Sequence, residues 1–311
     1  MSEQQQFILG IDGGGTKTHA VLSALDGTVV AERFGGASNV QIAGIPKAAE
    51  TVFKLLDECC KWASCKADAV QSIVVGLAGA GRSADKTSFV EALTSLGQQN
   101  SFPIKNVIVE TDARIALEAA FAGGSGIVII AGTGSIGLYR TKEGTIHRAG
   151  GWGRILGDEG SSFAIARDAL AAVMRAHDER GEKTVLTEKA FQQFRVTAVE
   201  DLIPRIYQDA VDITGFTLKV LFAAEDDAVA RGVLSKNADA LVELVQTLLK
   251  HAPPQKKAAV ALMGGLLTEE NAYSTMVKEK IVAALPQQVL MLKPKFTAAF
   301  GAAIIGLNAF Q

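Results

Sequence analysis

The sequence predicts an α/β protein with two mixed five-stranded sheets and helices on their faces. In the first third of the chain, strand-length apolar runs and helical patterns follow the order β-β-β-α-β-α-β. From Gly126 a similar order begins again, and in both halves a glycine-rich turn joins the first strand to a second strand. Antiparallel strands followed by parallel crossovers produce a mixed sheet covered by helices. A mixed sheet covered by helices is therefore expected in each half of the chain.

The first of these turns follows an N-terminal apolar run. Residues 7–11 precede Asp12, which is followed by three glycines and by Thr16-Lys17-Thr18. Glycines let backbone N–H groups approach an anion closely, and such loops hold phosphates. A carboxylate at the end of a buried strand can hold a hydrated divalent cation beside them. The stretch predicts a phosphate-binding turn with a cation site.

This turn differs from a P-loop, which has the pattern G-x-x-x-x-G-K-[ST] and opens into a helix. Here the lysine comes one residue late, after Thr16. The runs 18–25 and 28–34 follow, separated by Asp26-Gly27, a dipeptide that favours a type I′ hairpin turn. The turn therefore connects two strands, and Lys17 is expected to face solvent or to pair along a strand.

Periodicity and helix breakers predict the helices and strands in the rest of the first half. Pro46 at a first helical turn and apolar residues at helical spacing predict a helix over 46–61. Strands are expected at 72–77 and 105–110, and helices at 83–96 and 113–122. The strand at 105–110 ends in Thr111-Asp112, and the ordinary explanation for that aspartate is a helix N-cap.

The second half begins with a strand at 126–131, the turn 132–135, and strands at 136–140 and 145–149. Residues 132–137 match the dinucleotide fingerprint G-x-G-x-x-G. That fingerprint must open a helix, and a strand follows here, so the match is discounted.

A segment with four glycines and Trp152 then leads to the adjacent carboxylates Asp158 and Glu159, just before a helix expected at 161–177. Acidic residues are favourable at a helix start, so electrostatics is the competing explanation for them. Core packing is the competing explanation for Trp152.

The C-terminal part begins with a helical stretch over 183–250, interpreted as scaffold and ended by Pro253-Pro254. A strand over 258–263 is capped by Gly264-Gly265. The remaining elements are a helix from about 269, a strand at 288–292 and a last helix over about 294–309.

Composition excludes several classes of function. The chain has 31 basic and 33 acidic residues, well mixed, and a nucleic-acid surface would need clustered Lys and Arg. Residues 1–6 lack the basic region of a signal peptide, and the uncharged stretches 119–139 and 296–311 fit buried elements better than membrane spans. The three cysteines, within 59–65, lack metal-ligand spacing. We therefore expect a cytoplasmic protein with no nucleic-acid or membrane partner.

Three glycine-containing turns follow predicted strands along the chain: Asp12-Gly13-Gly14-Gly15-Thr16, then 131–135, then 263–265. This order resembles the sugar kinase/Hsp70/actin superfamily. Within it, the runs 150–153 and 157–160 resemble the N-acetylglucosamine kinase branch, grouped with the BadF/BadG/BcrA/BcrD ATPases.

The resemblance spans nearly the whole chain and implies two ribonuclease H-like, actin-like ATPase domains with a cleft between them. The implied boundaries are 1–113 plus a C-terminal helix at about 296–311, and 114–295 with a helical insertion at about 183–252.

The resemblance implies ATP- and Mg²⁺-dependent phosphorylation of the 6-hydroxyl of N-acetylglucosamine. Asp112 matches the general base, and Asp12 would hold Mg²⁺ through water. Residues matching the ATP-binding positions are Gly13, Gly14, Gly15, Thr16, Gly132, Thr133, Gly134, Ser135, Gly264 and Gly265. Residues matching the sugar-binding positions are Asn39, Asp112, Gly151, Trp152, Asp158 and Glu159.

Other functions stay open. Glucosamine or another hexose is an alternative substrate. An activase that drives electrons through an iron–sulfur cluster into a partner dehydratase would need cysteines near the second phosphate turn, and every cysteine lies in 59–65. A non-catalytic sugar-binding regulator is the third alternative. A homodimer is expected only because closed two-fold dimers are the commonest assembly.

Overall fold

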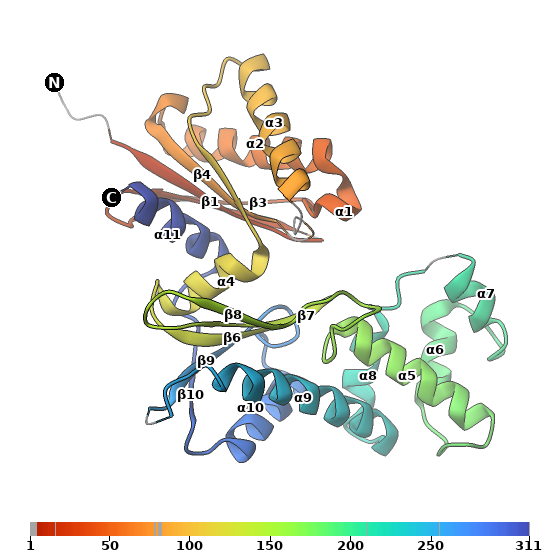
Figure 1. The fold of residues 1–311 in the computed structure, drawn as a ribbon. Helices are drawn as coiled ribbons and strands as arrows, with labels where there is room; N and C mark the ends of the chain where they lie inside the picture. The colour runs from red at the N-terminus through yellow and green to blue at the C-terminus, as the bar shows by residue number, and fades with distance from the viewer. Residues whose placement is uncertain are drawn as a thin grey trace. The chain divides into compact units, whose positions relative to one another are not determined.

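The computed structural model describes residues 5–15, 17–77, 79, 83–209, 211–254 and 256–310. Thr16, one of the expected ATP-binding residues, lies outside this part of the chain. The chain forms two units: Met1–Gly124 with Pro294–Gln311, and Ser125–Lys293 (Figure 1). Each unit has its own hydrophobic core and its own five-stranded sheet.

The sheet of the first unit has the strand order β3-β2-β1-β4-β5. The first three strands pair antiparallel with one another, and β4 and β5 join by parallel pairing. The strands are β1 (Phe7–Gly13), β2 (Thr18–Ala24), β3 (Val29–Gly35), β4 (Val70–Leu77) and β5 (Val107–Glu110).

Helices cover both faces of this sheet because alternate residues of β1 are apolar or lack a side chain. Phe7, Leu9 and Ile11 join the core under α2 and α3. Gly10 faces α11, where a Cβ would lie 2.1 Å from the carbonyl oxygen of Ala299, so the helix backbone rests directly on the strand. The helices are α1 (Val40–Ala43), α2 (Ile45–Trp62), α3 (Ser83–Gln99), α4 (Asp112–Phe121) and α11 (Ala298–Phe310).

The sheet of the second unit repeats this topology with the order β10-β9-β6-β7-β8. Again the first three strands are antiparallel, and β9 and β10 add by parallel pairing. The strands are β6 (Gly126–Ala131), β7 (Ser135–Arg140), β8 (Ile146–Gly150), β9 (Ala258–Met263) and β10 (Val289–Leu292). The predicted α/β fold with two mixed five-stranded sheets is confirmed.

The two sheets differ in what lies between their third and fourth strands. In the second unit, a largely helical stretch separates β8 from β9, and its apolar faces form one core with the sheet. These helices are α5 (Ser162–His177), α6 (Leu186–Phe194), α7 (Leu202–Tyr207), α8 (Phe216–Ala223) and α9 (Ala228–Leu249); α10 (Ala272–Ala284) lies between β9 and β10. In the described residues, no helix is long and apolar enough to cross a membrane.

Two local expectations were wrong. A type I′ turn needs positive φ at both central residues, yet between β2 and β3 only Gly27 has it, with φ 87°. The Asp26 carboxylate instead accepts the N–H of Thr28 at 2.8 Å, which closes a longer loop. The last helix begins at Ala298 rather than near 294, because the N–H of Phe296 donates to the carbonyl of Ala119 in α4.

The boundary between the units falls after Gly124, so α4 belongs with the first unit, where it packs against α11. The domain limits given from the sequence, at 113 and about 296, stay a prediction.

Candidate active site

Two carboxylates lie at the carboxyl ends of the parallel strands in the first unit. Asp12 is near the end of β1, paired with Gly76 of β4, and Asp112 begins α4. A Cβ on Gly76 would lie 2.2 Å from Ile115, so the glycine lets α4 approach the sheet. Burial, and then the charge of Asp112, raises the pKa of Asp12 to about 6. This places the two groups within electrostatic reach.

Lys17 is exposed, as the sequence predicted. Its backbone carbonyl accepts the N–H of Gly14 at 3.0 Å, which closes the glycine turn. Its ammonium lowers the pKa of Asp12 against the effects of burial and Asp112. The exposed ammonium is therefore within electrostatic reach of the carboxylate. The only sequence signal was its position five residues after Asp12.

The turn itself is held by the segment that follows β3. The Gly14 carbonyl accepts the N–H groups of Ser38 at 3.1 Å and of Asn39 at 3.0 Å. A Cβ on Gly13 would lie 2.5 Å from the Ser38 hydroxyl, so a glycine is needed there. Asn39 uses its Oδ1 to cap α1, accepting the N–H of Gln41 at 2.9 Å. Asn39 therefore sits directly against the phosphate-type turn.

Asp112 is not the N-cap that the alternative explanation required. The cap of α4 is Thr111, whose hydroxyl accepts the N–H of Arg114 at 3.1 Å. Asp112 Oδ1 accepts the N–H of Ala113 at 2.9 Å. Burial raises the pKa of Asp112, although this backbone hydrogen bond opposes the shift. A carboxylate with a raised pKa in such a place is a candidate proton acceptor.

In the second unit, two glycine turns lie side by side. The N–H of Gly132 donates to the carbonyl of Gly134 at 2.9 Å, and a Cβ on Gly132 would lie 3.9 Å from the nitrogen of Gly265. Gly264 has φ 89°, and its Cβ would meet the carbonyl of Ala131 at 2.4 Å. Thr133 is exposed on the turn. The two turns present backbone to one region of the second unit.

Asp158 ties the glycine-rich segment 150–157 to the first of these turns. Its Oδ1 accepts the N–H of Gly153 at 3.1 Å, and its carboxylate also accepts the N–H of Ser135. A Cβ on Gly134 would lie 2.6 Å from its Oδ2. Burial raises the pKa of Asp158, whereas these two backbone bonds lower it. Its carboxylate is thus partly committed to holding the loops.

The helix-start explanation for Asp158 and Glu159 is not needed. The N-cap of α5 is Ser161, whose hydroxyl accepts the N–H of Ala164 at 3.2 Å, and the first turn of α5 contains no acidic residue. The side chain of Glu159 is exposed, while its carbonyl accepts the hydroxyl of Ser135 at 2.6 Å.

Trp152 is on the surface, so the core-packing explanation was wrong. Its side chain is 67% exposed, and the Arg148 guanidinium stacks 4.3 Å from the centre of its ring. Arg148 also donates to the carbonyls of Gly150 and Gly151. Gly151 has φ 72°, a conformation that side chains disfavour. The segment therefore presents an aromatic ring whose position is set by an arginine.

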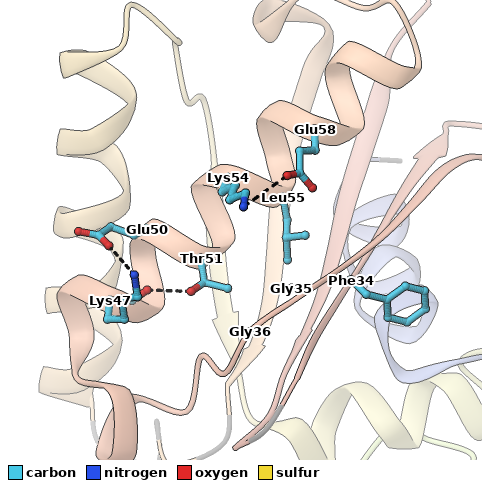
Figure 2. Close-up of a pocket in the computed structure, with 9 residues that line it drawn as sticks. All are labelled: Phe34, Gly35, Gly36, Lys47, Glu50, Thr51, Lys54, Leu55 and Glu58. Carbon is cyan, nitrogen blue, oxygen red and sulfur yellow. Dashed lines mark hydrogen bonds and ion pairs between the residues drawn. The ribbon is translucent and has the colours of Figure 1, made fainter.

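A separate cavity of about 320 Å³ lies between the end of β3 and α2 (Figure 2). Two lysine–glutamate pairs of α2, Lys47–Glu50 and Lys54–Glu58, lie along it. The side chain of Phe34 points away from α2 (Figure 2) and stacks on His19, with ring centroids 4.4 Å apart. None of the expected site residues lines this cavity.

The cysteines are three free thiols. Cys59 and Cys60 are buried in α2, and burial raises the pKa of Cys59 to about 12. Within the described ranges, no group of three or more His, Cys, Asp or Glu side chains could hold a metal ion.

The two sheets share one topology, and each has a glycine turn after its first strand. One of these turns also has a carboxylate pair. Together these features define the class of actin-like ATPases and sugar kinases. The chain belongs to the BadF/BadG/BcrA/BcrD ATPase family, whose model matches residues 9–306. The predicted superfamily and branch are confirmed.

Similarity to individual proteins extends over almost the full length. The chain is 34% identical to the N-acetylmuramic acid/N-acetylglucosamine kinase of Clostridium acetobutylicum, covering 96% of this chain and 98% of that protein. It is 32% identical to the N-acetyl-D-glucosamine kinase of Dictyostelium discoideum, covering 98% and 99%. The solved structure of a Chromobacterium violaceum protein, proposed to be an N-acetylglucosamine kinase, superposes with a TM-score of 0.78 at 26% identity, covering 97% and 99%.

Proposed function

We propose that this protein transfers the γ-phosphoryl group of ATP to the 6-hydroxyl of N-acetylglucosamine. The observation that carries the proposal is the cluster of two carboxylates with raised pKa values and one ammonium beside a glycine turn, formed by Asp12, Asp112 and Lys17. The names of the full-length relatives support the acceptor, and the family supports the use of ATP.

The donor set around Asp12 fits Mg²⁺. Asp112 and Lys17 both lie within electrostatic reach of Asp12, so the cluster carries an excess of negative charge when both carboxylates are ionised. Carboxylate oxygens and water are the ligands that Mg²⁺ prefers. Asp12 would hold the ion through water, and the bound ion would neutralise charge on the β- and γ-phosphates. Lys17 would add a second positive charge at the same phosphates.

Asp112 acts on the acceptor. It accepts the proton of the sugar 6-hydroxyl as that oxygen bonds to the γ-phosphorus and the bond to the bridging oxygen of ADP breaks. Its raised pKa brings its basicity closer to the working pH, which favours general base catalysis. Gly13, Gly14 and Gly15 supply backbone around the transferred group, and Thr16 stays a prediction.

The remaining site residues divide by role. Residues proposed to contact the nucleotide are Gly132, Thr133, Gly134, Ser135, Gly264 and Gly265. Residues proposed to contact the sugar are Asn39, Gly151, Trp152, Asp158 and Glu159. The exposed ring of Trp152 and the exposed carboxylate of Glu159 support this division, because both are accessible to a ligand.

Coupled ADP release with a panel of sugars tests the function. The panel is N-acetylglucosamine, N-acetylmuramic acid, glucosamine, glucose and no sugar. We expect the highest kcat/KM with N-acetylglucosamine and little release without sugar. Preference for glucosamine or glucose would change the acceptor only. Sugar-independent release that needs a protein partner would contradict the kinase and support the activase. Sugar binding without release would support a regulator.

Cytoplasmic location and a homodimer stay predictions, which cell fractionation and light scattering would check.

A further inference from the structure

Two buried side chains from distant helices hold the peptide groups of Gly160. The N–H of Gly160 donates to Asn237 Oδ1 of α9 at 3.1 Å, and its carbonyl accepts the hydroxyl of Tyr273 of α10 at 2.8 Å. Asn237 is 3% exposed and Tyr273 is fully buried. A backbone donor and an acceptor at one residue are thus satisfied by side chains 77 and 113 positions away.

Other contacts fix Asn237 as a hydrogen-bond acceptor for Gly160, and burial keeps Tyr273 a donor. The amide nitrogen of Asn237 donates to the carbonyl of Val233 at 3.0 Å and to Asp168 Oδ2 at 3.3 Å, which leaves the amide oxygen for Gly160. Lys236 also donates to Asp168, at 2.8 Å. Burial raises the pKa of Tyr273 far above its ordinary value, so its hydroxyl keeps its proton and remains a donor.

Gly160 also packs against α9 without room to shift. Its φ is 82°, and a Cβ would lie 2.5 Å from Leu241 and 2.9 Å from the carbonyl of Asn237. The residues just before it carry the proposed sugar contacts: Glu159, whose carbonyl accepts the Ser135 hydroxyl at 2.6 Å, and Asp158. The position of Gly160 therefore sets the position of both carboxylates relative to the turn 132–135.

The chain before this point is much less packed. Three large apolar side chains of the segment 150–157 are exposed: Trp152, Ile155 and Leu156. Ile155 is 86% exposed and Leu156 is 80% exposed, so they contribute little core contact. Gly160 is consequently where a segment with exposed apolar side chains meets the core of the second unit.

We infer that Asn237 and Tyr273 are positioning residues, which hold Gly160 so that Asp158 and Glu159 stay aligned with the turn 132–135. They touch neither substrate. The role in acceptor binding rests on the proposed function, whereas the restraint on the segment does not.

The test compares Tyr273→Phe with Ser274→Ala. Each variant removes one buried hydroxyl from the first turn of α10. The Ser274 hydroxyl bonds only within that turn, to the N–H and carbonyl of Asn271 at 3.0 and 3.1 Å. Tyr273→Phe leaves the buried Gly160 carbonyl without this donor, a change worth about a tenfold effect. Both variants are first checked for folding by circular dichroism and thermal melting.

Two readouts are taken on the whole protein. Hydrogen exchange by mass spectrometry, without ligand, follows peptides that cover residues 150–162. Acceptor affinity is followed by the emission of Trp152 on adding N-acetylglucosamine, in a Trp62→Phe background that removes the other tryptophan. We expect Tyr273→Phe to speed exchange in these peptides and to weaken sugar affinity about tenfold. Ser274→Ala should change both by less than about twofold. Asn237→Ala should repeat the Tyr273→Phe result.

Exchange and affinity in Tyr273→Phe that match Ser274→Ala would overturn the inference and leave Tyr273 a residue of the core. If Tyr273→Phe does not fold, Asn237→Ala is judged by the same two readouts. If the parent releases no ADP with any sugar, the proposed function fails, and faster exchange in the Tyr273 variant would still support the restraint on the segment.

Discussion

In both units a glycine turn follows the first strand of a mixed five-stranded sheet. The two turns differ in the charged side chains that they carry. The turn after β1 has Asp12 and Lys17 on it and Asp112 beside it. The turn between β6 and β7, residues 132–135, carries no charged residue. The nearest carboxylate, Asp158, accepts backbone N–H groups of Ser135 and Gly153.

This difference indicates that the two turns have different functions. A turn with backbone and hydroxyl donors but no charged side chain can bind a nucleotide, but it has no carboxylate that could take a proton or hold a cation. A turn with two carboxylates and an ammonium can do both, at the cost of burying charge in the folded protein. The first unit is therefore expected to carry the chemistry and the second to contribute binding.

The largest effect is expected from Asp112→Asn. The amide keeps the size of the side chain but cannot accept the hydroxyl proton, so kcat should fall about 10²–10⁴-fold. ATP affinity, measured by calorimetry, should change little. Near-normal kcat would show that Asp112 only begins α4 and would remove the chemical role from the first unit.

The second effect concerns stability in the absence of Mg²⁺ and ATP. The pKa of Asp12 is raised from 3.8 to about 6 in the folded protein. The folded state then binds this proton more tightly than the unfolded chain. Ionisation of Asp12 therefore lowers the free energy of unfolding, increasingly as the pH rises from about 4 to about 6. Above pH 6 this loss in the free energy of unfolding reaches about 3 kcal/mol.

Asp12→Asn should therefore unfold in urea at a higher concentration than the parent at pH 7.5, with a gain that is smaller by about 1 kcal/mol at pH 5. Asp26→Asn is the control. Its exposed carboxylate has a lowered pKa because it accepts the backbone N–H and the hydroxyl of Thr28, so it is ionised across this range and should show no such trend. An Asp12→Asn variant less stable than the parent at pH 7.5 would contradict the buried charge.

The third effect compares neighbouring glycines of the second unit. Gly264→Ala forces a Cβ to 2.4 Å from the Ala131 carbonyl at φ 89°, whereas a Cβ on Gly265 meets no atom within 4 Å. Gly264→Ala should lower the free energy of unfolding by about 1–3 kcal/mol, and Gly265→Ala should leave it nearly unchanged. Equal unfolding midpoints for the two variants would rule out the close approach.

The smallest effect is expected from Lys17→Met. Loss of one charged contact to phosphate should raise KM for ATP or lower kcat by about tenfold in total. Lys47→Met is the control, because Lys47 pairs with Glu50 on the surface of α2. Equal kinetics for the two variants would show that the Lys17 ammonium does not contact the phosphates.

Much of the fold follows from local pattern. Periods of two and of about 3.6 residues, with Gly and Pro as breakers, predicted the strands and most of the helices. The start of α11 was missed because Phe296 bonds to Ala119, a contact that sequence spacing does not reveal. The hairpin between β2 and β3 was predicted, but its turn type was wrong because the Asp26 side chain bonds to Thr28.

The site was predicted in outline because glycine turns and strand-end carboxylates have a local signature. The use of each side chain was harder to predict. Ser161, rather than Asp158 or Glu159, caps α5, and Thr111, rather than Asp112, caps α4. The contacts of Asn237 and Tyr273 with Gly160 join residues far apart in sequence, and no pattern within either helix indicates them.

The central claim is a phosphoryl transfer from ATP to a sugar hydroxyl, and the product tests it most directly. The protein is incubated with ATP, Mg²⁺ and N-acetylglucosamine, and the products are followed by phosphorus and proton NMR. We expect ADP and the sugar 6-phosphate in equal amounts. ADP with inorganic phosphate, and an unmodified sugar, would contradict it.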